Sequence, residues 1–146
     1  MANTYIIAEI GINHNGSLDE AIKLIDAAIF AGASCVKFQK REPRVSVPKS
    51  QWDVPKKTPW GEMPYIEYKE RMEFGEDEYA AIDRYCKEKG IDWFASAWDI
   101  PSVGFLLMFD TPYIKVPSAM AIDRELLECL SQCSNGKIVM LSTGMW

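Results

Sequence analysis

Four polar side chains interrupt segments of the chain that are otherwise apolar. They are Glu9, Lys37, Ser96 and Lys115. A strand buried in a parallel sheet is normally apolar on both faces, so a charge inside it must pair with an opposite charge or meet a charged ligand. Lysine carries a compact charge that suits phosphate or carboxylate groups. Two lysines and one carboxylate on three strands therefore point to one site for an anionic ligand.

The position of these residues along the strands favours a shared site. Each interruption lies toward the carboxyl end of its strand, and ligands of barrels and open α/β sheets bind at that end. Side chains alternate between the two faces of a strand, which places Glu9 with Gly11 and Lys37 with Gln39. The alternative is structural: an ion pair between Glu9 and Lys37, with Lys115 reaching solvent.

The elements that position these residues alternate between strand and helix. A Ser-x-x-Glu capping box at 17–20 begins the first helix, and Asp99 and Asp123 are expected to cap the third and fourth helices. The expected strands span 5–11, 35–39, 93–98, 113–118 and 137–144, and the first two expected helices span 18–31 and 76–89. This order predicts an α/β fold with parallel strands and right-handed crossovers.

Two architectures fit this alternation of strands and helices. One is an open, doubly wound sheet, and the other is a (β/α)8 barrel of the TIM type, here represented by about its first five β/α units as a partial barrel. Complete barrels typically take about 250 residues, whereas this chain has 146. We expect residues 1–146 to form a single domain.

One segment, about 40–74, breaks the rhythm of strands and helices. It is rich in proline and contains Trp52 and Trp60. A connection this long is usually functional or disordered, and its aromatic side chains favour order, with a short helix expected at 65–71. The two tryptophans are candidates either for a lid over a sugar or for anchoring the loop. The acidic stretch that follows, 73–83, is expected to be a solvated helix face.

Composition excludes several classes of partner. The net charge of −5 argues against nucleic acid or a membrane surface as the main partner, and no apolar run reaches the ~18 residues of a membrane span. No signal peptide is recognised, and the cysteines lack C-x-x-C spacing. These cysteines are Cys35, Cys86, Cys129 and Cys133. We therefore expect a cytoplasmic protein with reduced thiols.

The only histidine of the chain, His14, lies in the polar loop after the first expected strand. That loop is at the expected catalytic end of the sheet, so His14 is a candidate functional residue; a hydrogen-bonding role within the loop is the alternative. Neither a Walker sequence nor a G-x-G-x-x-G motif is present, which excludes a nucleotide P-loop.

Five motifs together resemble the sialic acid synthase family, which includes the N-acetylneuraminate synthases and other nonulosonic acid synthases. The motifs span residues 8–16 (AEIGINHNG), 36–39 (VKFQ), 94–96 (FAS), 113–118 (YIKVPS) and 141–145 (LSTGM). The segment 60–74 is also similar to the long second loop of that family. The resemblance covers essentially the whole chain.

The resemblance implies a (β/α)8 barrel that catalyses a condensation. Phosphoenolpyruvate joins an open-chain N-acyl amino sugar such as N-acetylmannosamine, water attacks C2, phosphate leaves by C–O cleavage, and a nine-carbon 2-keto acid forms. It also implies a divalent metal ion, Mn²⁺ or Mg²⁺, that acts on the sugar aldehyde as a Lewis acid. The open strand edges of a partial barrel additionally predict a homo-oligomer.

Residue by residue, the resemblance assigns roles that overlap with the strand interruptions. Lys37 and Lys115 match the lysines that hold phosphoenolpyruvate, and Ser118 matches a serine that contacts its phosphate. Glu9 matches a carboxylate near the sugar and the reacting carbons, and Gln39 matches a residue near the amino sugar. We therefore expect Glu9 and Lys37 to be catalytic.

Two further residues are expected at this site, Ser96 against phosphoenolpyruvate and His14 against the sugar. The chain also departs from the family pattern in two respects. Many members carry an acid just after the serine of the fourth strand, where this chain has Ala119 and Met120. The two histidines that bind the metal in the family match no residue up to Trp146, so no metal ligand is assigned in this chain.

Three functional hypotheses follow. The first is a nonulosonic acid synthase, or a part of one. The second is another aldolase that condenses phosphoenolpyruvate, such as a sugar-phosphate synthase, which the lack of a marked basic cluster for a second phosphate disfavours. The third is a non-catalytic or incomplete half-barrel that binds an anion or a sugar, which Met120 and the missing histidines favour.

Overall fold

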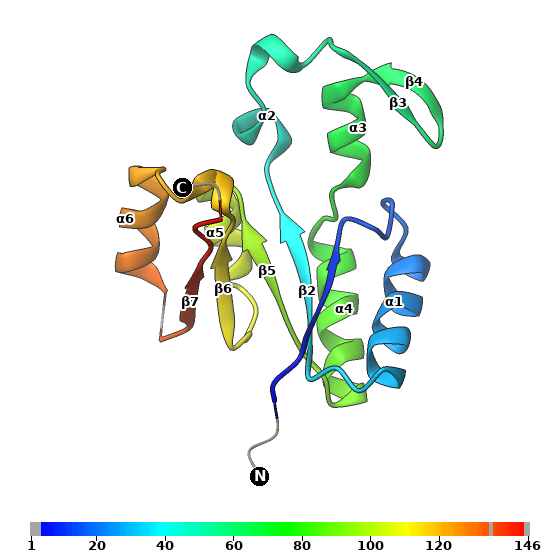
Figure 1. Ribbon diagram of the computed structural model, residues 1–146, viewed down its shortest axis with the longest axis vertical. Coiled ribbons are helices and arrows are strands. Elements are labelled where there is room, and N and C mark those ends of the chain that lie inside the picture. Colours follow the sequence, from blue (N-terminus) through cyan, green and yellow to red (C-terminus); the bar gives the residue numbers. More distant parts are fainter. Residues whose placement is uncertain (1–3, 135, 145–146) are drawn as a thin grey trace.

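The computed structural model describes residues 4–134 and 136–144, and its main feature is a five-stranded parallel sheet (Figure 1). The strands are β1 (Ile7–Gly11), β2 (Cys35–Lys40), β5 (Asp92–Ala97), β6 (Tyr113–Val116) and β7 (Ile138–Leu141). They lie in the order β1-β2-β5-β6-β7, which is their order along the chain. A doubly wound sheet reverses its strand order at a switch point, and no reversal occurs among the described strands.

Four helices connect these strands, and the amino termini of three of them are capped as the sequence predicts. They are α1 (Leu18–Phe30), α4 (Glu76–Lys89), α5 (Ile100–Leu106) and α6 (Arg124–Cys133). The side chains of Ser17, Asp99 and Asp123 accept hydrogen bonds from backbone N–H groups in the first turns of α1, α5 and α6. Each cap satisfies a donor that has no partner within the helix.

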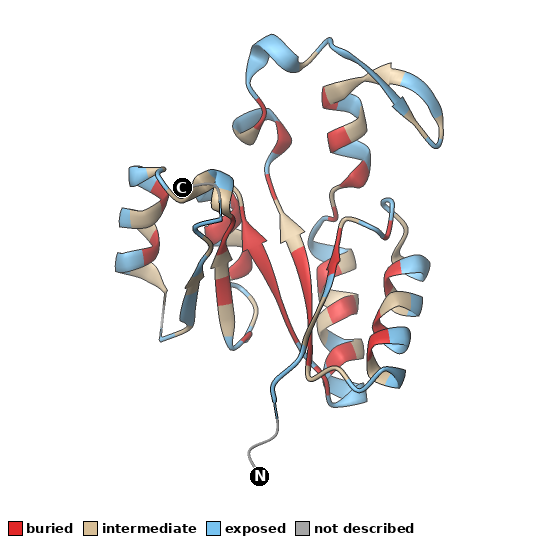
Figure 2. Cartoon of the chain, viewed as in Figure 1, coloured by how far each residue is buried: buried red, intermediate tan, exposed pale blue. Residues whose placement is uncertain are grey.

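The hydrophobic core lies between the sheet and these helices, as the band of buried residues in Figure 2 shows. Alternate strand residues enter it, namely Val36, Phe38, Ala95, Ala97, Ile114 and Val116, together with Ile25, Ile82, Val103 and Leu126 from the helices. Since side chains alternate along a strand, Lys37, Ser96 and Lys115 project from the opposite face. The sheet therefore has one apolar face under the helices and one face that carries the polar interruptions.

Three expected strands are shorter than predicted, and the first of them begins at Ile7 rather than at residue 5. The fourth ends at Val116, and a short 3-10 helix, η2 (Ser118–Met120), begins after Pro117. Proline has no N–H to continue the ladder, which accounts for the end of the strand. The fifth spans Ile138–Leu141 rather than 137–144. Met145, the last residue of the fifth motif, lies outside the described residues.

The segment between β2 and α4 is ordered into several short elements that project beyond the carboxyl ends of the strands (Figure 1). They are α2 (Pro43–Ser46), the 3-10 helix η1 (Lys49–Gln51), the hairpin of β3 (Pro55–Thr58) and β4 (Gly61–Pro64), and α3 (Tyr65–Met72). The predicted short helix is confirmed by α3. The indole N–H of Trp52 donates to the carbonyl of Val47, and the guanidinium of Arg71 stacks on Trp60. Both tryptophans thus contact the segment that contains them, which favours the anchoring role.

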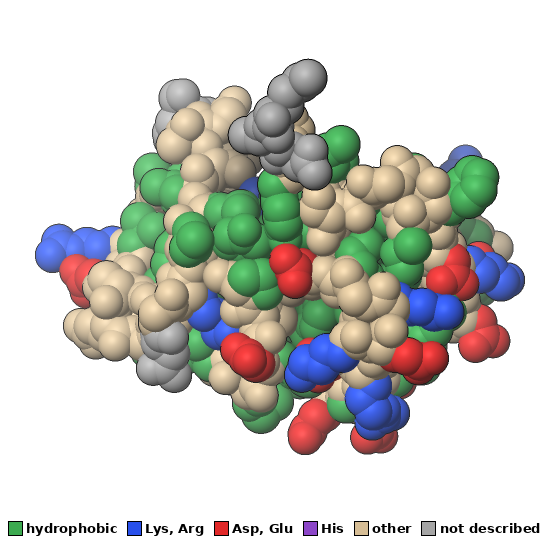
Figure 3. Space-filling model, turned by 90° about the horizontal axis from the view of Figure 1, so that it is seen from below, with side chains coloured by type: hydrophobic (Ala, Val, Ile, Leu, Met, Phe, Trp, Pro, Cys, Tyr) green, Lys and Arg blue, Asp and Glu red, His purple; other side chains and the backbone are tan. Residues whose placement is uncertain are grey.

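Other features of the fold bear on the expected partners. Among the described residues, no helix is both long and apolar enough to span a membrane. All four cysteines carry free thiols. On the face shown in Figure 3, which is the lower end of Figure 1, acidic and basic side chains are interspersed around exposed hydrophobic ones.

Candidate active site

Three of the four strand interruptions are in direct contact. β1 and β2 pair so that Glu9 lies opposite Lys37, and the Lys37 Nζ is 2.7 Å from the Glu9 Oε2. The same ammonium donates to the Ser96 Oγ at 2.9 Å. The Lys37 side chain is only 7% exposed, whereas that of Glu9 is 55% exposed. The ion pair that the sequence leaves as an alternative is therefore present, with a buried ammonium and an exposed carboxylate.

Lys115 joins this group from the next strand. Ser96 on β5 lies opposite Lys115 on β6 in the register of the two strands. Partial burial and the charge of Lys37 lower the pKa of Lys115 below its ordinary value, and the charge of Glu9 opposes that shift. Two partly desolvated ammonium groups beside one carboxylate leave an excess of positive charge, which an anion would neutralise. Ser118 begins η2 just beyond β6.

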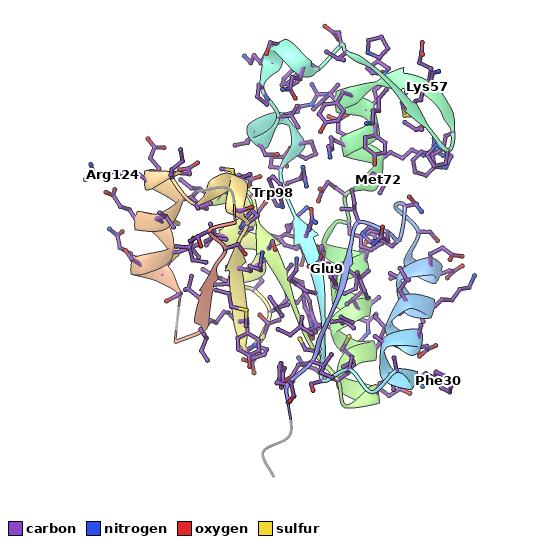
Figure 4. The ribbon with its side chains drawn as sticks, in the orientation of Figure 1. Glu9, Phe30, Lys57, Met72, Trp98 and Arg124 are labelled. Carbon is purple, nitrogen blue, oxygen red and sulfur yellow. The ribbon has the colours of Figure 1, made fainter. Side chains whose placement is uncertain are left out.

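Gln39, at the end of β2, lies at the edge of the same group. A side chain on Gly11 would begin 3.0 Å from the Glu9 Oε1 and 3.3 Å from the Gln39 Nε2. Gly11 also has a φ of +58°, which favours glycine. The missing side chain at Gly11 therefore leaves room for Glu9 and Gln39 to face the same space. In Figure 4, Lys57 marks the projecting segment and Phe30 lies near the opposite end of the molecule. Glu9 lies between them.

A cluster of buried charges lies beside Gln39 and was not predicted. The Arg41 Nη2 donates to the Gln39 Oε1 at 2.9 Å, and its guanidinium carbon lies 4.1 Å from the centre of the Trp98 ring. The Arg41 Nε lies 3.2 Å from the Glu73 Oε1, and the Arg41 backbone N–H donates to the Glu73 Oε2. Lys40 adds a longer ion pair to Glu73 at 3.8 Å.

Glu73 corrects one expectation from the sequence. Its side chain is only 9% exposed, so the acidic stretch that begins with it is not solvated throughout. Burial raises the pKa of Glu73 to about 7, although the charges of Lys40 and Arg41 and the Arg41 N–H oppose the shift. The carboxyl is thus held by two cations in a poorly solvated place, which makes the cluster sensitive to changes in any of its members.

His14 occupies a different environment from the one expected of a sugar-binding residue. Its side chain is buried, its ring stacks on Phe74 with 4.0 Å between the ring centres, and its Nδ1 accepts from the Gly16 N–H at 3.1 Å. Burial lowers its pKa to about 4, so the ring is neutral near pH 7. This placement does not support a contact with sugar. It supports the alternative, in which His14 holds the β1–α1 loop.

One cavity lies close to the Arg41 cluster. It has a volume of about 260 Å³ and is lined by residues that include Val45, Trp98, Ile100, Met120 and Asp123. It thus adjoins η2 and the first turns of α5 and α6, at the carboxyl ends of β5 and β6. A second cavity of about 200 Å³ lies in the projecting segment and is lined by Gln51, Val54, Lys56 and Tyr65, without Lys37 or Lys115.

The described residues do not fit a complete metal centre. No group of three or more His, Cys, Asp or Glu side chains converges anywhere in residues 4–134 and 136–144. The buried His14 already uses its Nδ1 as an acceptor. A metal site requires several donors with suitable geometry, which this part of the chain does not provide by itself, and metal dependence stays a prediction.

Sequence reasoning found the strand residues and missed Arg41 and Glu73. The strand residues stand out because each interrupts an apolar run. Arg41 and Glu73 are 32 positions apart, lie outside the strands, and look like ordinary surface charges in a polar segment. One signal was available: Glu73 and Phe74 fall within the second-loop segment that carries the family resemblance.

Several known proteins with similar sequences are named as synthases of sialic-type acids. The model of the NeuB family matches residues 24–146. N-acetylneuraminate-9-phosphate synthases of Drosophila melanogaster and Homo sapiens are 39% and 38% identical, with 98% and 97% of this chain covered. An N,N'-diacetyllegionaminic acid synthase of Legionella pneumophila is 29% identical over 97% of the chain.

A solved structure of a sialic acid synthetase is also similar to this chain. The N-acetylneuraminic acid synthetase of Leptospira borgpetersenii serovar Hardjo-bovis, in complex with citrate, superposes with a TM-score of 0.83 at 28% identity. The match covers 99% of this chain and 46% of that one. The chain spans only 38% to 40% of the three curated relatives named above. The family model covers most of the chain, and the chain therefore belongs to the NeuB family.

Proposed function

We propose that this chain forms part of a synthase that condenses phosphoenolpyruvate with an N-acyl amino sugar such as N-acetylmannosamine. Phosphoenolpyruvate, the sugar aldehyde and one water are consumed, a new C–C bond forms, and the C–O bond to phosphate is cleaved. The products are a nonulosonic acid of the sialic type and inorganic phosphate. The names of the relatives, which are synthases of sialic-type acids, support this reaction class.

The proposal includes the architecture of the whole enzyme. We propose that the sheet is the first part of a (β/α)8 barrel, because its strand order follows the chain and its polar face carries the candidate site. In barrels of this type the active site lies at the carboxyl ends of the strands. Lys37, Ser96 and Lys115 lie on that polar face, and Ser118 lies two residues after the end of β6.

The observation that carries the proposal is the convergence of Lys37 and Ser96 with Lys115 alongside. Two ammonium groups and a hydroxyl can bind the phosphate and carboxylate of phosphoenolpyruvate, since charge-assisted hydrogen bonds to such groups are the strong ones. Lys37 donates to Ser96 already, so the two residues are preoriented. As phosphate leaves, the same ammonium groups stabilise the charge that develops on it.

Glu9 and Gln39 are proposed to face the sugar. Glu9 has the more exposed side chain of the ion pair, so its carboxylate can turn toward a second substrate while Lys37 binds the first. Gln39 lies beside it across Gly11. These two residues provide a carboxylate and an amide that can bind hydroxyl and acylamino groups.

Three further properties belong to the proposal. The ion that polarises the aldehyde is expected to be Mn²⁺ or Mg²⁺, with ligands outside this chain. The protein is expected to act in the cytoplasm, and as a homo-oligomer. Its partners are the two small substrates rather than nucleic acid or membrane.

The proposed function is tested by the binding of phosphoenolpyruvate and by phosphate release in the presence of Mn²⁺ and N-acetylmannosamine. The test variant is Lys37→Met, and the matched control is Lys23→Met, an exposed lysine on α1 paired with Glu20. We expect Lys37→Met to weaken phosphoenolpyruvate binding at least about tenfold, and Lys23→Met to leave it unchanged. Release of phosphate that depends on both the sugar and Lys37 supports a working site. Lack of phosphoenolpyruvate binding by the wild type would overturn the proposal.

A second candidate is a binding module without catalysis. Met120 favours it, because an apolar side chain stands where many members of the family carry an acid. In that case phosphoenolpyruvate binds through Lys37, but no phosphate is released with any amino sugar. The same pair of measurements separates the two functions when it is made on the full-length protein, because the proposed metal ligands lie outside this chain.

A further inference from the structure

Arg41 makes three kinds of contact at once, although its side chain is only 8% exposed. Its guanidinium donates to the Gln39 carboxamide, pairs with Glu73 and stacks on Trp98. A planar guanidinium can do this because its donors lie in a fixed plane, with both faces free to stack. The side chain is therefore held from three sides, by β2, by the residue after α3 and by the end of β5.

The contact with Gln39 fixes which end of the carboxamide faces the site. Arg41 has only donors, so the group that it binds must be the carbonyl oxygen, Oε1. The amide nitrogen is then turned toward Gly11 and Glu9, where the Gln39 Nε2 lies 3.3 Å from the position of a Gly11 side chain. The backbone of Gln39 is fixed as well, because its carbonyl accepts from the buried Tyr79 hydroxyl at 2.8 Å.

We propose that Arg41 is a positioning residue, which holds the Gln39 amide so that its NH2 group faces the sugar and binds an acceptor oxygen of that substrate. This inference rests on the proposed function and adds a determinant of sugar recognition to it. The sugar group that meets Gln39 is then a carbonyl or hydroxyl oxygen used as an acceptor. Without Arg41 the amide can rotate and present its carbonyl, which repels such an oxygen.

The geometry explains why an arginine is suited to this position. One donor group contacts Gln39 while another lies against Glu73, and the stack on Trp98 sets the plane of both. A lysine at position 41 has a single ammonium group and no plane to stack. It can pair with Glu73, but it cannot also fix the orientation of the Gln39 carboxamide.

The inference is tested by titrating N-acetylmannosamine into the chain saturated with phosphoenolpyruvate. We expect Arg41→Met to weaken sugar binding about tenfold or more, because the Gln39 amide loses the charge-assisted hydrogen bond that holds it toward the sugar. Its affinity for phosphoenolpyruvate should stay within about twofold of wild type, since Lys37 and Lys115 are untouched. Arg44→Met is the matched control, because Arg44 lies on the neighbouring helix α2 with an exposed side chain. The control should change neither affinity.

Two more variants separate positioning from charge and from folding. Arg41→Lys keeps the positive charge beside Glu73, and we expect it to bind sugar as weakly as Arg41→Met. The double variant Arg41→Met with Glu73→Gln removes the carboxylate that the single variant leaves unpaired, and we expect its sugar binding to stay weak although its stability recovers. Full recovery of sugar binding in either variant would overturn the positioning role.

An independent readout is the side-chain amide signal of Gln39 in ¹⁵N NMR spectra. A fixed carboxamide gives one sharp pair of signals, and we expect Arg41→Met to broaden that pair or return it to the shifts of a free glutamine. If the wild type does not bind phosphoenolpyruvate, the proposed function fails and the role of Arg41 fails with it. If phosphoenolpyruvate binds and Arg41→Met leaves sugar affinity unchanged, only the role of Arg41 is overturned.

Discussion

The ammonium of Lys37 and the carboxylate of Glu9 form an ion pair of 2.7 Å in which the cation is buried and the anion is exposed. This asymmetry matters because the two partners differ in what they lose when the pair breaks. Glu9 can be solvated again at little cost, whereas a buried Lys37 needs another anion. An incoming phosphate or carboxylate can therefore replace Glu9 as the partner of Lys37.

This exchange predicts that Glu9 competes with the anionic substrate. In Glu9→Gln the competing carboxylate is removed, and we expect phosphoenolpyruvate to bind more tightly by up to about fivefold, the range of an exposed ion pair. Turnover should fall at the same time, because Glu9 is proposed to serve the sugar. The measurement is calorimetric titration of phosphoenolpyruvate, with Glu20→Gln on α1 as the control. Weaker binding by Glu9→Gln would contradict the competition.

A second prediction concerns the pH dependence that Lys115 confers. Its pKa lies below the ordinary 10.5 because of partial burial and the charge of Lys37. The protonated form binds an anion, so affinity for phosphoenolpyruvate should fall as pH rises, and at a lower pH than for an ordinary lysine. In Lys115→Met the affinity should be lower at neutral pH and this alkaline loss should be reduced. Titrations across the alkaline range with the exposed Lys57→Met as control check the prediction.

The site was predictable to the extent that it lies on strands. Lys37 and Lys115 break apolar runs whose other members are buried, so their positions identify both the sheet and its functional face. The caps at Ser17, Asp99 and Asp123 were predictable for a similar reason, because local side-chain chemistry alone determines them.

The remaining features depend on contacts that sequence patterns do not record. The hairpin of β3 and β4 is mostly exposed, so it lacks the alternation of apolar residues that marks a half-buried strand. The pairing of Arg41 with Glu73 depends on how the segment between β2 and α4 folds back. The burial of His14 follows from its stack on Phe74, a residue 60 positions further along the chain.

A third prediction concerns the effect of His14 on stability. Its pKa falls from 6.5 in the unfolded chain to about 4 in the folded protein, because burial disfavours the charged ring. The folded state then binds fewer protons between these values, so His14 contributes a loss of stability as pH falls from about 6.5 to 4. The full loss is on the order of 3 kcal/mol.

The test compares wild type with His14→Phe, which keeps an aromatic ring against Phe74 but cannot take up a proton. Urea unfolding at several pH values between 4 and 7 gives the difference in the free energy of unfolding. Glu73 titrates in the same range with the opposite sign, and it cancels in this difference. A difference that does not change with pH would show that His14 is protonated equally in both states.

A fourth prediction uses two glycines with similar backbone conformations and different surroundings. Gly16 and Gly32 have φ values of +71° and +81°. An added side chain at Gly16 would begin 2.2 Å from the Arg71 carbonyl oxygen, whereas at Gly32 it would meet nothing within 4 Å. Gly32→Ala should cost about 1 kcal/mol for the strained backbone. Gly16→Ala should cost about 1–3 kcal/mol more, because the loop or the end of α3 must move.

Chemical denaturation of both variants checks this prediction. The comparison isolates the contact between the β1–α1 loop and α3, since the backbone cost is common to both. Equal losses of stability would show that the loop does not pack against α3 in solution. The larger loss in Gly16→Ala should also weaken sugar binding, because the displaced loop follows Gly11 directly.

A fifth prediction concerns the 146-residue chain by itself and one of the two edges of its described sheet, the β7 edge. Among the described strands, β7 pairs only with β6, and its Ile138, Val139 and Leu141 have exposed fractions of 61%, 41% and 49%. An open, apolar edge strand is a template for pairing with another chain. We therefore expect a mass above the 16.6 kDa of one chain in light scattering at micromolar concentration.

The double variant Ile138→Lys with Leu141→Lys places two charges on this edge, and charged edge strands resist pairing. It should shift the mass toward that of one chain, while Phe30→Lys, which changes an exposed residue at the end of α1, should leave the mass unchanged. A wild type that is already monomeric would show that the edge does not drive association. An equal shift in Phe30→Lys would instead assign the association to exposed apolar surface in general, because α1 lies away from β7 (Figure 1).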